Sequence, residues 1–312
     1  MKDYIFNYSQ IEKDGYVVQG YTIANQEFIV SCHAEESKFR KFFHLANRCS
    51  RLYIFDSLSK KLTGVITLNH SAHVGGISYD SLHDALYVTG GSGKVHTYCY
   101  HKLKEKMVKK HNILWADFSK GQDISSCIIS NGNLNIRKPD GLNKIVSAAT
   151  LYCYGSYLYV ATCSDVGDVV CYHLEYSLDS SSVVAIKEKE YHNLAPAIQG
   201  IAVYEQNNKK YLLFSQSYGR KIFSAIKCYE IISHSLLFIG QEVIPISGME
   251  GIYVDSSGTI SAVFEHSSKD SYVTYFKNLT SNIDSLLEEK FVLGGRKNQQ
   301  RVLENAMKKS KK

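Results

Sequence analysis

Proline and tryptophan are scarce in this sequence, which has three prolines and one tryptophan among 312 residues, and no run of 18 apolar residues occurs. A helix needs about 20 consecutive, mostly apolar residues to span a bilayer, so the sequence carries no signal for one. Proline is largely kept out of the middle of sheets, and its scarcity is therefore compatible with many strands. The 23 tyrosines and 13 phenylalanines also favour strands. We expect a soluble, strand-rich chain.

The eight cysteines include no Cys-x-x-Cys pair, which excludes the usual spacing of zinc-binding and thiol-redox motifs. Several of them lie within apolar strand patterns, where a free thiol behaves as a small hydrophobic side chain. Free thiols are typical of a reducing compartment, and the N-terminus lacks the pattern of a secretory signal. We expect a cytoplasmic protein; a secreted protein whose signal had been removed would show the same features.

Charges of the two signs balance over most of the chain. The formal net charge is +6, and residues 296–312 contain seven basic side chains against one acidic, so residues 1–295 are net neutral. Nucleic-acid binding requires clustered lysine and arginine, and no nucleic-acid partner is expected for a neutral body. The basic tail is interpreted as a solvated helix, with contact to an acidic partner as the alternative.

Familiar catalytic motifs are absent as well. The sequence contains no GxSxG, HExxH, GxxxxGK[S/T] or GxGxxG pattern, so the matching hydrolase, zinc-protease and phosphate-loop mechanisms have no support. The GGSG at 90–93 precedes the strand-like segment KVHTY rather than a helix, and we interpret it as a hairpin turn. No residue is assigned a catalytic role, and whether the protein is an enzyme stays open.

An internal repeat is the strongest positive feature of the sequence. Each copy has three apolar segments, and the first segments begin at residues 19, 75, 148, 199 and 250. Four of the five carry a glycine at their second position, which we call the repeat glycine. The third segments end in an aromatic residue, at Phe55, Tyr98, Tyr172, Tyr229 and Tyr275.

The spacing of these aromatic residues predicts the fold. They are 43, 74, 57 and 46 residues apart, close to the length of a propeller blade, which is a twisted sheet of four antiparallel strands. We predict an all-β propeller with five blades, and six if the long gap hides another. Fourth, outer strands are expected near 62–68, 107–116, 183–191 and 236–244, with an insertion between 104 and 146.

We expect the propeller to cover residues 1–277, and C-terminal helices with the basic tail to cover 278–312. The last blade lacks an obvious fourth strand. The N-terminal segment DYIFNY, residues 3–8, is predicted to pair with it, because pairing removes an exposed sheet edge. Beyond Tyr275 the pattern turns helical, with a capping residue near Asn282 and a stop at Gly294-Gly295.

Several short segments resemble a group of bacterial β-propeller proteins. They are VQG at 18–20, AHVGGISYD at 72–80, QGIA and SQSYGR at 199–202 and 215–220, and MEGI and FEHSS at 249–252 and 264–268. The resemblance covers about residues 16–276 and is looser to strictosidine-synthase-like, gluconolactonase-like and virginiamycin-lyase-like propellers. It implies the propeller architecture. No reaction is implied, because the metal ligands of those enzymes have no matching positions here.

The repeat register also selects candidate ligand-binding residues. In a propeller the inner strands line the axis, and the loops at one mouth of the channel present side chains to a shared pocket. We predict that a ligand is bound there by Gln19, Gln199, Gln216, Tyr218 and Arg220. Arg220 would bind a carboxylate or phosphate group. The alternative is that these polar side chains only satisfy one another and ordered water.

Imidazoles and carboxylates are expected at the same mouth. The candidate ligands of a divalent cation are His33, His73, Glu250, Glu265 and His266. Oxygen donors favour Ca²⁺, whereas imidazoles favour a transition metal. The sequence thus supports recognition of a small ligand or protein at the channel mouth. The alternative is a metal-assisted lyase or hydrolase that acts on a small molecule in the same pocket.

Overall fold

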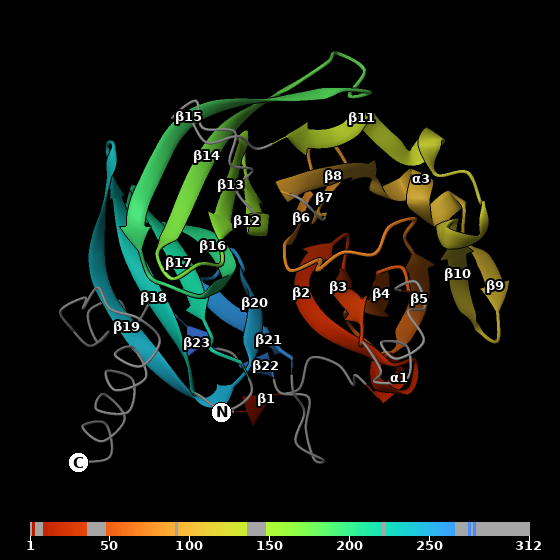
Figure 1. Ribbon diagram of the computed structural model, residues 1–312, viewed down its shortest axis with the longest axis horizontal. Coiled ribbons are helices and arrows are strands. Elements are labelled where there is room, and N and C mark those ends of the chain that lie inside the picture. Colours follow the sequence, from red (N-terminus) through yellow and green to blue (C-terminus); the bar gives the residue numbers. More distant parts are fainter. Residues whose placement is uncertain are drawn as a thin grey trace.

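The computed structural model describes residues 2–3, 9–35, 48–90, 93–135, 148–219, 223–265, 274–275 and 277–278. Strands dominate these residues and form sheets around a common centre (Figure 1). The described α-helices are α1 (Ser9–Lys13) and α3 (Tyr100–Glu105). Neither is long and apolar enough to cross a membrane, and the same holds for every helix that the structure describes.

Four sheets are complete blades. The first contains β2 (Tyr16–Ala24), β3 (Glu27–Ala34), β4 (Arg51–Asp56) and β5 (Leu62–Thr67). The second contains β6 (Ile77–Asp80), β7 (Ala85–Thr89), β8 (Lys94–Cys99) and β11 (Ile128–Asn135). The third contains β12 (Ala148–Tyr154), β13 (Tyr157–Thr162), β14 (Gly167–Tyr176) and β15 (Val183–Leu194). The fourth contains β16 (Ile198–Gln206), β17 (Lys209–Gln216), β18 (Phe223–Ile232) and β19 (Ser235–Ser247).

A fifth, three-stranded sheet lies between the fourth and first blades. It consists of β20 (Met249–Val254), β21 (Thr259–Phe264) and β23 (Lys277–Asn278). The expectation of five full blades is therefore corrected to four complete blades and this smaller sheet. The reason lies in the third segment of the last repeat. Its described end, β22 (Thr274–Tyr275), pairs with β1 (Lys2–Asp3) and not with β21.

The innermost strands form a closed ring in which β2, β6, β12, β16 and β20 each contact the next, and β20 contacts β2 (Figure 1). The repeat glycines lie where these strands approach most closely. A Cβ on Gly20 would lie 2.4 Å from the Gly75 carbonyl oxygen, and one on Gly200 would lie 2.6 Å from the Glu250 carbonyl oxygen. Neither distance leaves room for a methyl group. The repeated glycine thus reflects packing between blades.

The middle strands are buried on both faces, as their continuously apolar sequence predicts. In β3 the adjacent residues Ile29 and Val30 are both fully buried, but they belong to different clusters. Ile29 packs with residues of the second blade, and Val30 packs with Val263 of the fifth sheet. The aromatic residues that end the third segments at 55, 98, 172 and 229 are buried as well. Period-two alternation therefore divides each sheet between two neighbouring cores.

The prediction that residues 107–116 form the outer strand of the second blade is wrong. This segment forms β9 (Val108–Lys110) and β10 (Ile113–Asp117), and β10 pairs in parallel with β5 of the first blade. The fourth strand of the second blade is instead β11. The fourth strands expected near 62–68, 183–191 and 236–244 are confirmed as β5, β15 and β19.

Two expectations about the chain ends reach beyond the described residues. The N-terminal residues Lys2 and Asp3 pair antiparallel with Tyr275 and Thr274, next to the fifth sheet. The rest of the predicted closing strand, residues 4–8, lies outside the described residues. The C-terminal helices and basic tail are expected over 278–312; Asn278 belongs to β23, and residues 279–312 lie outside the described residues.

Candidate functional site

A β-bulge recurs at the start of the inner strands and positions two of the predicted ligand-binding residues. Between Val18 and Gly20 the register with β3 shifts by one residue, and between Ile198 and Gly200 the register with β17 shifts in the same way. Gln19 and Gln199 are therefore the extra residues of equivalent bulges. Bulges re-aim side chains and are common next to binding sites. The repeat thus gives Gln19 and Gln199 equivalent places on one face of the propeller.

Two of the predicted glutamines are held firmly by their amide nitrogens. The Nε2 atom of Gln19 donates to the Val18 carbonyl over 2.8 Å, and that of Gln216 donates to the Pro196 carbonyl over 2.8 Å. Both side chains are buried, and the Oε1 atom of each has no hydrogen-bond partner among the described residues. Two acceptor oxygens are left for water or a ligand. Gln199 is half-buried.

Tyr218 adjoins Gln216, whose Nε2 atom donates to the tyrosine hydroxyl over 3.1 Å. Between them, the Oγ atom of Ser217 is buried and has no partner within the described part of the chain. The structure therefore brings Gln216 and Tyr218 together. Arg220, the cation predicted to bind the ligand's anionic group, lies outside the described residues.

Two of the predicted metal ligands contact each other. The rings of His33, in β3, and His73, before β6, stack with centroids 4.9 Å apart. The loss of hydration lowers the pKa of His73, and the nearby Glu265 carboxylate opposes this shift. An unperturbed histidine has a pKa of about 6.5, so His73 is mainly neutral at pH 7. This face thus holds two imidazoles within reach of a carboxylate.

The other predicted metal ligands do not complete a cation site in the described ranges. Glu250 is buried, and its carbonyl oxygen accepts a hydrogen bond from Ser215 Oγ over 2.8 Å. No three of His33, His73, Glu250 and Glu265 bring their ligand atoms within 4.8 Å of one another. His266 lies outside the described residues. A cation site formed by these residues therefore stays a prediction, which rests on the stacked pair of His33 and His73 and on Glu265.

A cavity of about 320 Å³ opens beside the histidine pair. We call it the Arg48 pocket. Its lining comes from the end of β3 and from the segments that precede β4 and β6, and consists of His33, Ala34, Arg48, Ser50, Ser71, Ala72 and His73. These strand ends lie on one face of the propeller, which we call the pocket face. The pocket combines a guanidinium with imidazoles and hydroxyls, all of which can donate hydrogen bonds.

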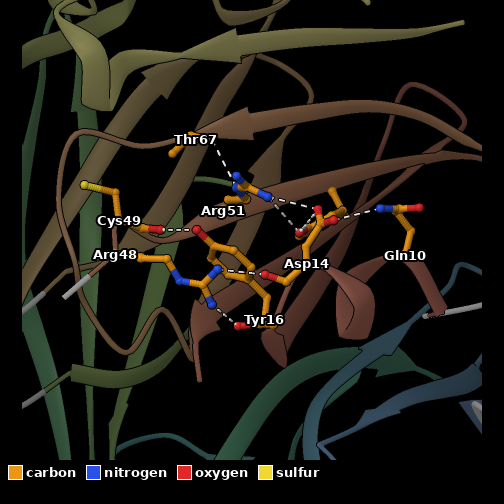
Figure 2. A network of polar contacts seen from close by, with 9 residues as sticks. Gln10, Asp14, Tyr16, Arg48, Cys49, Arg51 and Thr67 are labelled. Atoms are coloured by element: carbon orange, nitrogen blue, oxygen red, sulfur yellow. Dashed lines mark hydrogen bonds and ion pairs between the residues drawn. The ribbon is translucent and has the colours of Figure 1, made fainter. Parts of the chain in front are cut away.

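Arg48 is anchored by backbone carbonyls. Its Nη1 atom donates to the Asp14 carbonyl over 2.8 Å, and its Nη2 atom donates to the Gly15 carbonyl (Figure 2). Its Nε atom is buried without a partner in the described part of the chain. Carbonyl oxygens fix the orientation of the group without cancelling its charge. No described carboxylate forms an ion pair with Arg48.

The neighbouring Arg51, by contrast, is neutralised. Its Nη1 atom lies 2.9 Å from Asp14 Oδ2, which also accepts a hydrogen bond from the Tyr53 hydroxyl over 2.8 Å. The ring of Tyr16 contacts both arginines, with 4.7 Å to the Cζ atom of Arg48 and 4.6 Å to that of Arg51 (Figure 2). Such contacts attract guanidinium groups to the face of the ring. The network orients Arg48 and leaves its positive charge without a described carboxylate partner.

Comparisons with known proteins show no family for this chain. No protein-family model matches the chain, and no curated protein sequence matches it. Glutaminyl cyclase of Myxococcus xanthus is similar in structure at 10% identity and a TM-score of 0.45, covering 84% of this chain and 90% of the cyclase. The Dos1 propeller is similar at 8% identity and a TM-score of 0.36, covering 79% and 52% of the two chains. A chain of a mitotic checkpoint complex is similar at 14% identity and a TM-score of 0.38, covering 84% and 75%.

Arg48 is the site residue that the repeat analysis missed. The predicted site residues precede the repeat glycines or follow the second strands, whereas Arg48 precedes a third strand. The available signal was a pair of arginines, Arg48 and Arg51, placed three residues apart at the start of that strand. Only the fold shows that one of the pair is neutralised by Asp14 and that the other faces a cavity.

Proposed function

We propose that the protein is a propeller binding protein that recognises a small molecule bearing a carboxylate or phosphate group in the Arg48 pocket. The observation that carries the proposal is the partly buried guanidinium of Arg48, which lines a cavity without a described counter-ion. A charge taken out of water is costly unless it is paired, and a bound anion would supply the missing partner.

The size and chemistry of the pocket fit such a ligand. A volume of about 320 Å³ is at the lower end of the range for small-molecule sites, which favours a compact ligand over a peptide segment. The Ser71 hydroxyl and the histidine nitrogens beside the guanidinium suit the several acceptor oxygens of a carboxylate or phosphate, whereas the Ser50 hydroxyl already donates to the Ala72 carbonyl. The stacked Tyr16 ring and the carbonyl contacts preorganise Arg48, which lowers the entropy lost on binding.

Binding should depend on pH through His73. Because burial lowers the pKa of His73 below the ordinary value of about 6.5, the imidazole is mainly neutral at pH 7 and takes up a proton as the pH falls. A protonated imidazole adds a second positive charge to the pocket, and a bound anion stabilises that form. We expect the affinity for an anion to increase between pH 7 and pH 5.5, and the increase to be absent in His73→Gln.

The test is calorimetric titration of the full-length protein with inorganic phosphate, glucose 6-phosphate, malate and, as the uncharged control, glucose. Arg48→Gln should weaken binding of the anions by about 10-fold to 150-fold, because a hydrogen bond to a charged group contributes about 1.5–3 kcal/mol. Lys209→Gln is the matched control. It removes an exposed cation that pairs with Glu230 away from the pocket face, and binding should not change.

Phosphate and malate separate the two ligand chemistries. Preference for glucose 6-phosphate and phosphate would identify a phosphate site, and preference for malate a carboxylate site. Glucose binding as tight as that of glucose 6-phosphate would contradict the proposal, as would anion binding that is equally strong in Arg48→Gln.

A metal-assisted lyase or hydrolase at the same mouth has one observation in its favour, which is the stacked pair of His33 and His73 with Glu265 nearby. In that alternative, Mn²⁺ would bind without the anion and would raise the thermal unfolding temperature. His73→Gln would remove this effect, and Arg48→Gln would leave it. The two variants therefore distinguish the functions.

A further inference from the structure

Three chemically different side chains meet on the face of the second blade opposite the Arg48 pocket. They are Asp84, in the turn between β6 and β7, Cys99, the last residue of β8, and His101, in the first turn of α3. Their ligand atoms all lie within 4.8 Å of one another. Among the described residues this is the single group of three such side chains with that geometry.

The distances within the group are close to those of a metal centre. Cys99 Sγ lies 3.5 Å from Asp84 Oδ2 and 3.3 Å from His101 Nδ1. Around tetrahedral zinc the ordinary bond lengths place sulfur roughly 3.5 Å from the nitrogen and oxygen ligands. The third edge, from His101 Nδ1 to Asp84 Oδ2, is 2.6 Å and is a hydrogen bond. It has to widen by roughly 0.7 Å when a metal replaces the shared proton.

The backbone holds Asp84 in place for this role. Asp84 has a left-handed backbone conformation with φ of 51°, and its Oδ2 atom accepts the backbone N–H of His101 over 2.9 Å. Its carbonyl oxygen accepts the backbone N–H of Tyr100 over 2.9 Å. The turn is thereby tied to the start of α3 at two points. The side chain of His101 is 63% exposed, so its ring has room to adjust when an ion binds.

We propose that Asp84, Cys99 and His101 form a three-ligand site for a zinc-like divalent cation, with a fourth position open to solvent. Thiolate and imidazole select a borderline transition metal over Ca²⁺ or Mg²⁺, which prefer all-oxygen sites. The ion would join the β6–β7 turn to the end of β8. The site is distinct from the residues of the pocket face and does not depend on the function proposed for that face.

Metal binding releases one proton from the group to solvent and moves a second from one ring nitrogen to the other. The Cys99 thiol loses its proton to solvent, since the thiolate is the ligand. His101 binds the metal through Nδ1, so the hydrogen that Nδ1 shares with Asp84 is transferred through solvent to the Nε2 atom, where the neutral ring carries it. Asp84 exchanges its hydrogen bond from His101 for the metal. The side chains then contribute two negative charges against the two positive charges of the ion.

A second layer of contacts orients the carboxylate. The Tyr79 hydroxyl donates to Asp84 Oδ1 over 2.9 Å and accepts a hydrogen bond from Asn25 Nδ2 over 3.1 Å. The other carboxylate oxygen, Asp84 Oδ2, is thereby directed at Cys99 and His101. Tyr79 is a positioning residue in this account. Loss of such a partner commonly weakens metal affinity by about 10-fold to 100-fold.

The site is tested with metal alone, by titrating the reduced, full-length protein with Co²⁺ and then displacing it with Zn²⁺. The wild type should bind one equivalent of Co²⁺ with a thiolate-to-cobalt charge-transfer band in the near ultraviolet, and Zn²⁺ should abolish the band. Cys99→Ser should lack the band, and His101→Ala should bind at least tenfold more weakly. Tyr79→Phe should keep the band and bind about tenfold more weakly.

Matched controls keep the outcome interpretable. Cys163→Ser and His234→Ala change an exposed cysteine and an exposed histidine elsewhere, and both should match the wild type. Circular dichroism of the metal-free variants checks that each is folded. The proposal is overturned if the wild type shows no thiolate band or if the band persists in Cys99→Ser. It is also overturned if cobalt binding depends on His73 instead, because the ion then lies at the pocket face.

Discussion

Replacement of a repeat glycine by alanine tests the ring of inner strands most sharply. In Gly200→Ala the new Cβ would lie 2.6 Å from the Glu250 carbonyl oxygen, 2.6 Å from Ser215 Oγ and 2.8 Å from the Ile252 nitrogen. Two of these three atoms belong to the backbone of β20 and cannot move away by a change of rotamer. Gly200 has no positive φ, so alanine is excluded by the contact alone and not by the backbone conformation.

The structure predicts a cost of about 2–3 kcal/mol in the free energy of unfolding for Gly200→Ala. Extra atoms in a well-packed core usually cost about 1–3 kcal/mol, and a contact with backbone belongs in the upper part of that range. Gly20→Ala should cost a similar amount, because its Cβ would lie 2.4 Å from a carbonyl oxygen. In Gly251→Ala the closest atom is 3.0 Å away, so the cost should be about 1 kcal/mol.

Urea unfolding followed by circular dichroism and by the fluorescence of the single tryptophan, Trp115, measures these differences. Ala149 is the built-in control, because it occupies the equivalent position in the third blade. Ala149→Gly should cost no more than about 1 kcal/mol, the usual penalty for glycine. Equal costs for Gly20→Ala and Gly251→Ala, or costs below about 0.5 kcal/mol for both, would refute the close approach of the inner strands.

Two further predictions concern polar groups in the first two blades. Burial, assisted by the stacked His96, lowers the pKa of His70 to about 4. The folded state therefore binds fewer protons than the unfolded state between about pH 6.5 and pH 4. As the pH is lowered through that window, the free energy of unfolding should fall by about 3 kcal/mol. Urea titrations at several pH values should show a smaller fall for His70→Phe. Asp14→Ala leaves Arg51 and Tyr53 without their shared acceptor and should lower the free energy of unfolding by about 2 kcal/mol, with partial recovery in Asp14→Asn.

The repeat made much of the fold predictable. The aromatic residues that end the third segments at 55, 98, 172 and 229 are buried between blades, and the repeat glycine marks the contact between inner strands. Both features are needed once per blade, so they recur in the sequence. The continuous apolar runs of the middle strands follow from the same cause, since each sheet is covered on both faces.

The segment 107–116 shows where the pattern misleads. Its apolar residues fit an outer strand of the second blade, but β10 pairs in parallel with β5 of the first blade. The choice depends on contacts between distant parts of the chain. Met107 approaches Gly64 so closely that a Cβ there would lie 2.6 Å from the methionine methyl group. Local alternation carries no information about which of two sheet edges a strand will join.

The residues of the candidate sites also fall into two groups, those that the repeat indicates and those that only the fold brings together. The sequence predicts Gln19 and Gln199 because they precede the repeat glycine in two copies, and the structure places both in equivalent bulges. Arg48 was not found, because its charge matters only after Asp14 has neutralised Arg51. Asp84 and Cys99 are fifteen positions apart in the sequence and meet only when β6, β7 and β8 form a sheet. Sites made by single exceptions to a repeat are therefore visible only in three dimensions.

The central claim is that the guanidinium of Arg48 binds an anion, and its Nε–H group reports this most directly. In protein labelled with ¹⁵N-arginine, the Nε–H resonance assigned to Arg48 by its absence in Arg48→Gln should shift saturably on titration with phosphate or malate. The resonance of Arg51, whose Nε donates to Thr67 Oγ1 over 3.2 Å, should stay in place. An Arg48 resonance that does not respond, or shifts of equal size for both arginines, would contradict the account.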